Sequence, residues 1–304
     1  MVDLRRLAEK ININAIGICN ADRFSNVEYI LNNDEHLGIL PPFTETDIQK
    51  RVDPKQTLAD AKSFIVILEK YTPITYKRRE GRYGNISPAA CGVDYHRIVY
   101  DKLTQLKNAL FEIQPDGIYL PFVDNSPFSE KHIAERAGLG KILKNGLFYS
   151  EDFGSRCFIG IILTNQPLEN FYIQRFRQSP KIRLDLCEHC TACIRLCPGN
   201  ALSENGLNSY RCVSYLTQKK EMLSLEEENA LGHQIYGCDI CQKICPVNGV
   251  ISPDLETGIE VNLDELMQMS NKAFKLNYQK TAAGWRGKKQ LQRNAEIILK
   301  NMER

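Results

Sequence analysis

The sequence has no long apolar run and no excess of charge of one sign. No stretch approaches the roughly 18 consecutive apolar residues that a membrane-spanning helix needs, so we expect no membrane span. Basic residues total 39 and acidic residues 37, and the net charge of +2 gives no global field typical of a nucleic-acid binder, although a local basic patch is allowed. Arg5 and Arg6 suggest a twin-arginine export signal, but charged and polar residues follow where an apolar segment is required. We therefore expect a cytoplasmic protein.

Most of the 11 cysteines lie in one region, and their spacing predicts iron–sulfur clusters. The first run, CEHCTACIRLCP, has the CxxCxxCxxxCP pattern of bacterial ferredoxins, and the second, CDICQKICP, ends in the same Cys-Pro pair. In ferredoxins with two clusters, the fourth cysteine of a run binds the other cluster. This rule predicts one 4Fe-4S cube on Cys187, Cys190, Cys193 and Cys245, and a second on Cys197, Cys212, Cys238 and Cys241.

Structural zinc and disulfides are the alternatives for these cysteines. Zinc needs two cysteine pairs and has no use for a third cysteine at the same spacing or for the repeated Cys-Pro. Disulfides fit poorly because no secretory signal is apparent, and thiols in a reducing compartment are more naturally metal ligands. Two 4Fe-4S clusters are therefore the prediction.

The length of 304 residues suffices for two domains, and the cluster region is too small to be the catalytic scaffold. Apolar runs predict strands at 13–21, 63–71, 117–125 and 155–165, and helical patterns lie at 3–11, 57–63, 94–113 and 130–137. Residues 77–92 are expected to form a long connection. We predict an α/β module over residues 1–178, a two-cluster ferredoxin-like domain over 179–250 and a helical segment over 251–304.

Two side chains outside the cysteine region are candidates for chemistry. Asp124 ends a predicted strand and faces a loop that contains proline, where α/β proteins often place reacting groups. A turn or helix cap is an equally good interpretation of Asp124 from the residues alone. His96 lies in the first turn of a predicted helix, and a surface role is the simpler interpretation there.

Several motifs together resemble the epoxyqueuosine reductases, queuosine-pathway enzymes related to reductive dehalogenases. They are FVDNSPFSEKHIAERAGLG, FGSRCFIGIILTN, CEHCTACIRLCPGNAL, RCVSYLT, YGCDICQKICPVN and GWRGKKQLQRNAEIILKN. The resemblance runs from about Arg51 to the end of the sequence. It includes the isolated Cys212, which ordinary ferredoxins lack.

The resemblance implies a nitroreductase-like α/β module that binds cobalamin beside two 4Fe-4S clusters and reduces epoxyqueuosine to queuosine in tRNA. It implies that Asp124 is the proton donor, kept protonated by burial against the corrin. The corrin positions that it implies are Arg51, Ser87, Asp94, His96, Asp124, Lys144, Asn145, Ser155, Ser214 and Tyr215. Asp94 and His96 begin a DxHxxG-like motif, but position 99 is Val, so we expect base-off cobalamin without a histidine ligand.

The implied partners are tRNA and a low-potential electron donor, either a flavodoxin or a small ferredoxin. Lys219 and Lys220 are candidates for contacts with tRNA phosphates, although lysines at a loop end are commonly just solvated. A basic tail on the expected C-terminal helix is a further candidate for tRNA contact. It consists of Arg286, Lys288, Lys289, Arg293 and Lys300.

The sequence also departs from the family pattern in ways that bear on the substrate more than on the cofactors. Lys141 stands where an aromatic is usual and Leu143 where glycine is usual, and the segment around Pro88 lacks an arginine and a tyrosine. The sequence ends at Arg304, without the HEAT-like helical extension that longer members of the family use to hold tRNA. Two alternatives stay open: a cobalamin and iron–sulfur reductase of a small molecule, and an electron-transfer ferredoxin, which would leave residues 1–178 without a role.

Overall fold

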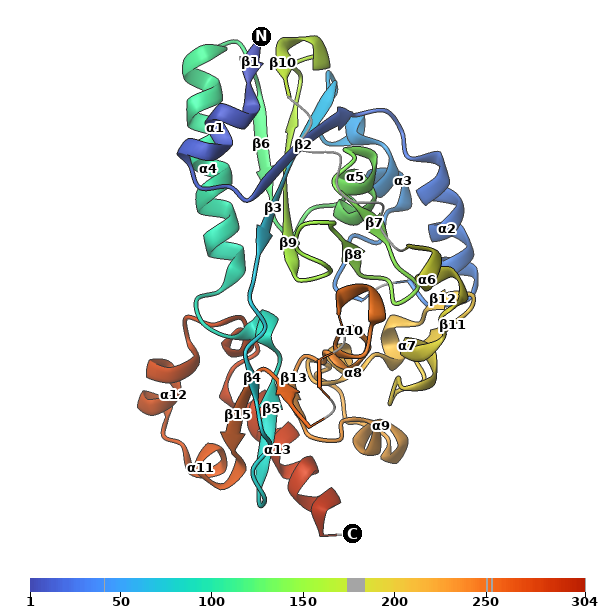
Figure 1. Ribbon diagram of the computed structural model, residues 1–304, viewed down its shortest axis with the longest axis vertical. Coiled ribbons are helices and arrows are strands. Elements are labelled where there is room, and N and C mark those ends of the chain that lie inside the picture. Colours follow the sequence, from blue (N-terminus) through green and yellow to red (C-terminus); the bar gives the residue numbers. More distant parts are fainter. Residues whose placement is uncertain (41, 174–183, 250, 253, 304) are drawn as a thin grey trace. The chain divides into compact units, whose positions relative to one another are not determined.

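The computed structural model describes residues 1–40, 42–173, 184–249, 251–252 and 254–303 (Figure 1). Its contacts divide the chain into two compact units. The first unit contains Met1–Lys70, His96–Leu143 and Leu147–Ile182, and the second contains Tyr71–Tyr95, Lys144–Gly146 and Arg183–Arg304. The predicted boundaries at residues 178 and 250 lie outside the described residues, so the three-part division stays a prediction.

A four-stranded antiparallel sheet forms the centre of the first unit, in the order β2, β3, β9, β6. Its strands are β2 (Ala15–Asn20), β3 (Ser63–Lys70), β9 (Cys157–Thr164) and β6 (Tyr119–Phe122). The first six residues of β3, SFIVIL, are all buried, as an uninterrupted apolar run in an inner strand predicts. The four predicted strands are confirmed, and with the helices they give the predicted mixed α/β class.

Helices accompany this sheet, together with two short strand pairs. The helices are α1 (Leu4–Lys10), α2 (Ser25–His36), α3 (Ile48–Val52), α4 (Tyr95–Ile113) and α5 (Glu130–Arg136). The pairs are β1 (Val2–Asp3) with β10 (Phe171–Tyr172), and β7 (Lys141–Ile142) with β8 (Phe148–Tyr149). Asp3 caps the first helix, because its side chain accepts a hydrogen bond from the Arg6 amide at 3.0 Å.

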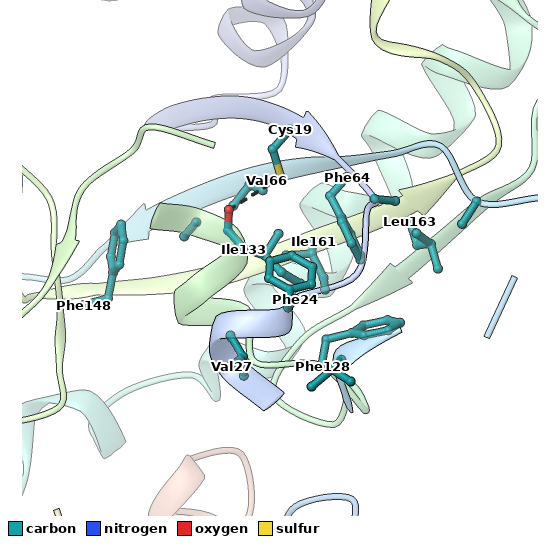
Figure 2. Close-up of a cluster of buried hydrophobic side chains, with 14 of the residues drawn as sticks. Cys19, Phe24, Val27, Phe64, Val66, Phe128, Ile133, Phe148, Ile161 and Leu163 are labelled. Atoms are coloured by element: carbon teal, nitrogen blue, oxygen red, sulfur yellow. Dashed lines mark hydrogen bonds between the residues drawn. The ribbon is translucent and has the colours of Figure 1, made fainter. Parts of the chain in front are cut away.

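Phenylalanine and aliphatic side chains together form the core on which α5 packs (Figure 2). Phe64 meets Phe128 edge to face, with ring centroids 5.3 Å apart. Ile133 of α5 is buried in the same cluster, and its carbonyl accepts from the Cys19 thiol at 3.7 Å. Burial raises the pKa of Cys19 to about 12, so this cysteine behaves as a small buried hydrophobe.

The helix predicted at residues 57–63 is wrong. A 3-10 helix at Pro54–Gln56 ends just before it, and β3 begins at Ser63. The main chain of Lys62 already pairs like a strand, since its amide donates to Thr164 O and its carbonyl accepts from the Ala21 amide, both at 2.9 Å. The residues in between, 57–61, form turns and irregular chain.

The second unit contains a three-stranded sheet, two short strand pairs and eight α-helices among its described residues. The sheet has the order β13 (Gln234–Tyr236), β5 (Tyr83–Ile86), β15 (Ile259–Asn262). The pairs are β4 (Thr75–Tyr76) with β14 (Glu256–Thr257), and β11 (Leu202–Ser203) with β12 (Gly206–Leu207). The helices are α6 (Leu184–His189), α7 (Ala192–Arg195), α8 (Val213–Leu216), α9 (Leu225–Ala230), α10 (Ile240–Lys243), α11 (Leu263–Gln268), α12 (Asn271–Tyr278) and α13 (Lys288–Met302). The long α13 confirms the predicted C-terminal helix.

No helix in the described part of the chain is both long enough and apolar enough to cross a membrane.

Candidate functional site

The eight clustered cysteines all belong to the second unit, on short helices and the turns that join them. Cys187 lies in α6, Cys193 in α7 and Cys241 in α10, and Cys212 is the residue just before α8. Such short elements change direction every few residues. This lets sulfurs from distant parts of the sequence approach one another, as an iron cube requires.

The thiols influence one another in two groups. Burial is the main reason that the pKa of Cys193 and of Cys245 is raised, and Cys187 and Cys190 add to the effect in both. In the other group, burial again comes first, and Cys197 adds to the raised pKa of Cys212. Cys212 in turn adds to the raised pKa of Cys238 and Cys241. These two groups of cysteines have the same members as the two predicted clusters. Cys193 of the first group also raises the pKa of Cys241 in the second, so the two groups are neighbours.

Main-chain amides are directed at several of these sulfurs. The Ala201 amide donates to Cys197 Sγ at 3.3 Å. Amides of Ser214 and Tyr215 lower the pKa of Cys212 against the effect of burial. Amides directed at sulfur favour the thiolate, which is the form that binds iron, so this donor set fits an iron–sulfur cluster. A single metal ion needs its ligands closer together than an iron cube does. Among the described residues, no three His, Cys, Asp or Glu side chains lie close enough together to hold a single ion.

Two glycines let chain segments approach closely around the cysteines. A Cβ on Gly199 would lie 2.0 Å from the Arg211 carbonyl oxygen, and Arg211 Nε donates to Gly199 O at 3.0 Å. This approach joins the segment after Cys197 to the residue before Cys212. Gly237, which precedes Cys238, has a φ of +72°, and a Cβ there would lie 2.6 Å from Cβ of the buried Ser87.

Helix α13 holds the loop that follows Cys212. Arg293 donates to the carbonyls of Leu216, Lys219 and Glu221 at 2.9, 2.5 and 3.2 Å. Asn294 is fully buried and donates to Thr217 O and Ile235 O, both at 2.8 Å. The prediction that Arg293 contacts tRNA is therefore wrong, because its donors are used inside the fold.

Some of the other predicted phosphate-binding cations have partners within the fold, and others are exposed. Lys219 Nζ lies 2.7 Å from Glu227 Oε1, and Lys300 Nζ lies 3.6 Å from Glu228 Oε2. Lys288 donates to Met269 O at 3.1 Å, and the Arg286 guanidinium lies 3.8 Å from the centroid of the Trp285 ring. Lys220 and Lys289 are exposed, which makes them the best placed of the set to meet a phosphate.

In the first unit the structure brings Asp124 and His96 together. Asp124 Oδ2 lies 3.2 Å from His96 Nε2, and the two side chains are 54% and 37% exposed. Asp124 follows β6 and has a φ of +58°, in the left-handed region that few non-glycine residues adopt. A hollow of about 360 Å³ beside them is lined by His96, Arg97, Tyr100, Pro121, Phe122, Val123 and Asn125. His96 is thus part of a candidate site, and the simpler interpretation of it as a helix surface residue is incomplete.

Sequence reasoning missed Glu130, the first residue of α5. Its Oε2 accepts a hydrogen bond from the Asp124 amide at 3.2 Å, and its Oε1 is buried with no hydrogen-bond partner among the described residues. Burial raises the pKa of the Glu130 carboxyl to about 8, with the charge of Asp124 as the next cause. No sequence signal distinguishes this residue from an ordinary acidic residue in the first turn of a helix.

Arg51, in α3, is a buried cation with unused donors. It is 6% exposed, and its Nε and Nη1 have no hydrogen-bond partner in the part of the chain that the structure describes. Burial lowers the pKa of Arg51, while Asp34 and Glu45 act in the opposite direction. Buried donors without acceptors are rare, so Arg51 fits a bound group that carries oxygen acceptors.

The remaining predicted cofactor positions divide between the two units. Ser155 is buried in the first unit, and Ser87 and Asn145 are buried in the second. In the second unit, Lys144 Nζ lies 3.0 Å from Glu204 Oε2, and the Asp94 amide donates to Lys280 O at 2.8 Å. These cofactor assignments stay predictions.

Comparisons with known proteins agree with this geometry. Residues 51–125 match the family described as "Epoxyqueuosine reductase QueG, DUF1730", and residues 186–248 match the "4Fe-4S double cluster binding domain". The epoxyqueuosine reductase of Bacillus subtilis (strain 168) is 36% identical over 311 residues, which cover 98% of this chain and 78% of that protein.

Two solved structures are also similar. One is an epoxyqueuosine reductase in a crystal with an epoxyqueuosine-modified tRNA-Tyr stem loop, with a TM-score of 0.85, 34% identity and coverage of 97% of this chain and 80% of that one. The other is a Bacillus subtilis epoxyqueuosine reductase whose catalytic aspartate loop is swung out of the active site, with a TM-score of 0.84, 33% identity and the same coverage.

Proposed function

The chain belongs to the epoxyqueuosine reductase family of oxidoreductases, and from this premise we propose that it reduces epoxyqueuosine to queuosine in tRNA. The observation that carries the proposal is the 36% identity with the Bacillus subtilis enzyme over 98% of the chain, which includes both the cysteine region and the Asp124 loop. The related structure with a modified tRNA-Tyr stem loop supports the same class of substrate here.

The reaction removes the epoxide oxygen. Both C–O bonds break, a C=C bond forms, and the oxygen leaves as water, so each turnover consumes two electrons and two protons. Residues 186–248 form a 4Fe-4S double cluster binding domain, and such clusters span the low potentials that this reduction needs. We propose a flavodoxin or a small ferredoxin as the electron donor.

We propose base-off cobalamin as the further cofactor. When bound, it would supply a low-valent metal centre that takes electrons one at a time and acts on the epoxide. The residues proposed to hold it are Arg51, Ser87, Asp94, His96, Asp124, Lys144, Asn145, Ser155, Ser214 and Tyr215. The unused donors of Arg51 support this assignment, because the amide and phosphate edges of the cofactor carry oxygen acceptors.

Asp124 is the proposed proton donor to the leaving oxygen. An epoxide oxygen leaves poorly unless it is protonated as its bond breaks, and a positioned acid is typically worth a factor of about 10² to 10⁴ in rate. Asp124 Oδ2 lies 3.2 Å from His96 Nε2, so His96 would orient this carboxyl. The catalytic aspartate of the related Bacillus subtilis structure also lies on a loop, which supports the role.

Asp124→Asn tests the mechanism. We expect the purified, anaerobically reconstituted variant to keep about eight irons and to take up cobalamin, and to lose at least about 100-fold in kcat on epoxyqueuosine-containing tRNA. Asp116→Asn, an exposed acid shortly before β6, is the matched control and should retain activity. Full activity of Asp124→Asn would remove Asp124 from the mechanism, and iron without cobalamin uptake in the wild type would favour the electron-transfer alternative.

Binding of tRNA can be followed through Trp285, the single tryptophan, which is 54% exposed and donates from Nε1 to Gln218 at 3.2 Å. We expect an epoxyqueuosine-modified anticodon stem loop to change its fluorescence. Lys220→Ala and Lys289→Ala should each weaken binding and lower the salt slope by about one, because each removes one phosphate contact. Lys10→Ala, at an exposed lysine of the first unit, is the control. An unchanged slope in both variants would exclude these contacts.

A further inference from the structure

Glu130 sits on a rigid support. Helix α5 is fixed in the core by Ile133 and Ala134, both essentially fully buried. Arg136, at the other end of the helix, lies 3.3 Å from the centroid of the Phe24 ring and donates to Asp22 O at 2.6 Å. The first turn of α5 therefore has a defined position, and the Glu130 carboxyl reaches back from it to the Asp124 amide.

The main chain at Asp124 needs such a support. A non-glycine residue in the left-handed region is strained, although Asp tolerates this region better than most residues, and the surrounding contacts decide whether it is adopted. Two contacts do so here: Glu130 Oε2 accepts from the Asp124 amide at 3.2 Å, and Asp124 Oδ2 lies 3.2 Å from His96 Nε2. One contact holds the backbone and the other the side chain.

We propose that Glu130 is a positioning residue for Asp124: its carboxyl holds the Asp124 main chain in the left-handed conformation and so keeps the Asp124 side chain beside His96. The proposal rests on the proposed function only in taking Asp124 as the proton donor. The contact itself does not depend on which reaction the protein performs.

The charges around Glu130 give the arrangement a pH dependence. Burial raises its pKa to about 8, the charge of Asp124 raises it further, and the Ser126 hydroxyl, the Asp124 amide and His96 act in the opposite direction. The carboxyl is therefore mostly protonated at neutral pH, and a protonated acid still accepts through its carbonyl oxygen. Above pH 8 the carboxyl ionises. The carboxylate still accepts from the Asp124 amide, but its buried charge repels the Asp124 carboxylate and displaces that side chain.

Hydrogen exchange of residues 119–128 tests the contact directly, in the wild type and three variants at one pH. Glu130→Ala removes the acceptor, so exchange in this segment should rise at least tenfold and kcat should fall at least tenfold with KM changed less than twofold. Glu130→Gln keeps a neutral carbonyl acceptor, so at pH 7 it should restore the protection and most of the turnover. Glu135→Gln, on the same helix and paired with Lys141 at 3.4 Å, is the control and should behave as the wild type.

The pH profile supplies a readout that a merely structural role would not move. Wild-type kcat should fall on the alkaline side with an apparent pKa near 8. Glu130→Gln cannot ionise there, so it should move this limb to the pH at which Asp124 alone loses its proton. The proposal is overturned if Glu130→Ala exchanges like the wild type, or if Glu130→Gln leaves the alkaline limb at the wild-type pH. Should Glu130→Ala fail to fold, the Glu130→Gln profile decides. Failure of the proposed function would appear separately, as full activity of Asp124→Asn while the exchange results stand.

Discussion

His132 is a single residue whose protonation state the fold controls. Burial lowers its pKa to about 4, Lys131 contributes next, and Glu135 acts in the opposite direction. The folded protein therefore holds His132 neutral, while the unfolded chain binds a proton below about pH 6.5. The neutral histidine contributes fully to stability above that pH, and the contribution is lost as the pH falls from 6.5 towards 4.

We expect His132→Asn to reduce the acid sensitivity of the protein. The asparagine can keep a contact with Ser129, whose Oγ lies 2.7 Å from His132 Nδ1, and it has no proton to gain. Between pH 7 and 4.5 the wild type should lose on the order of 2 kcal/mol more than the variant, or several degrees in Tm. Thermal unfolding at a series of pH values measures this. His36→Asn, at an exposed histidine, should show no such difference, and equal acid sensitivity of His132→Asn and wild type would refute the assignment.

Single residues could be assigned from the sequence where their role depends on spacing, and could not where it depends on burial. The cysteines could be assigned because a cube imposes a spacing on its ligands. Glu130 and Arg293 could not, because an acid in the first turn of a helix and a base in the last helix look ordinary until their partners are known. Asp124 was a candidate from its place at a strand end, and its contact with His96 joins residues from separate elements.

Helix α13 is the element whose role differs most from expectation, because it supports the cluster region from inside the second unit. Arg293→Gln should cost on the order of 2 to 4 kcal/mol, since it leaves the carbonyls of the loop after Cys212 without their charged donor. Thermal unfolding of the iron-loaded protein should show a lower Tm. Lys289→Gln on the same helix should leave the Tm unchanged, because Lys289 is exposed.

For tRNA binding we expect the reverse of the result for Tm: Lys289→Gln should differ from the wild type and Arg293→Gln should not. Lys289→Gln should reduce the salt dependence of binding, and Arg293→Gln, as long as it is folded, should leave it unaltered. A stable Arg293→Gln protein with a reduced salt slope would restore Arg293 to the tRNA surface and contradict the structural role.

Elements with strong local signals were predictable, and short elements defined by distant partners were not. The four strands of the main sheet and α4 follow from apolar runs and helical spacing. Strand β5 was placed in a long connection, because its four residues become a strand only by pairing with β13 and β15. The false helix at 57–63 shows the converse, since a helical pattern gave way to a 3-10 helix before it and to strand pairing at Lys62.

At the scale of the whole molecule, the cluster ligands and the main hydrophobic core belong to different units. All eight cysteines lie in the second unit, and the core around Phe64 lies in the first. Thiolates left without iron are buried groups that must either take up protons or become exposed. Loss of the clusters therefore destabilises the second unit. The first unit has its own buried sheet and does not use these ligands.

We therefore expect removal of iron by a chelator under anaerobic conditions to act on one unit. Hydrogen exchange should rise by at least tenfold across residues 184–249, which include β13, the strand that ends two residues before Cys238. Exchange in β3 and β9 should stay within about twofold of the holoprotein, because their protection comes from pairing with each other and from the core of the first unit. Reconstitution with iron and sulfide should reverse the change, which separates cluster loss from damage. If β3 and β9 lose protection together with the cysteine region, the two units unfold as one, and the first does not have independent stability.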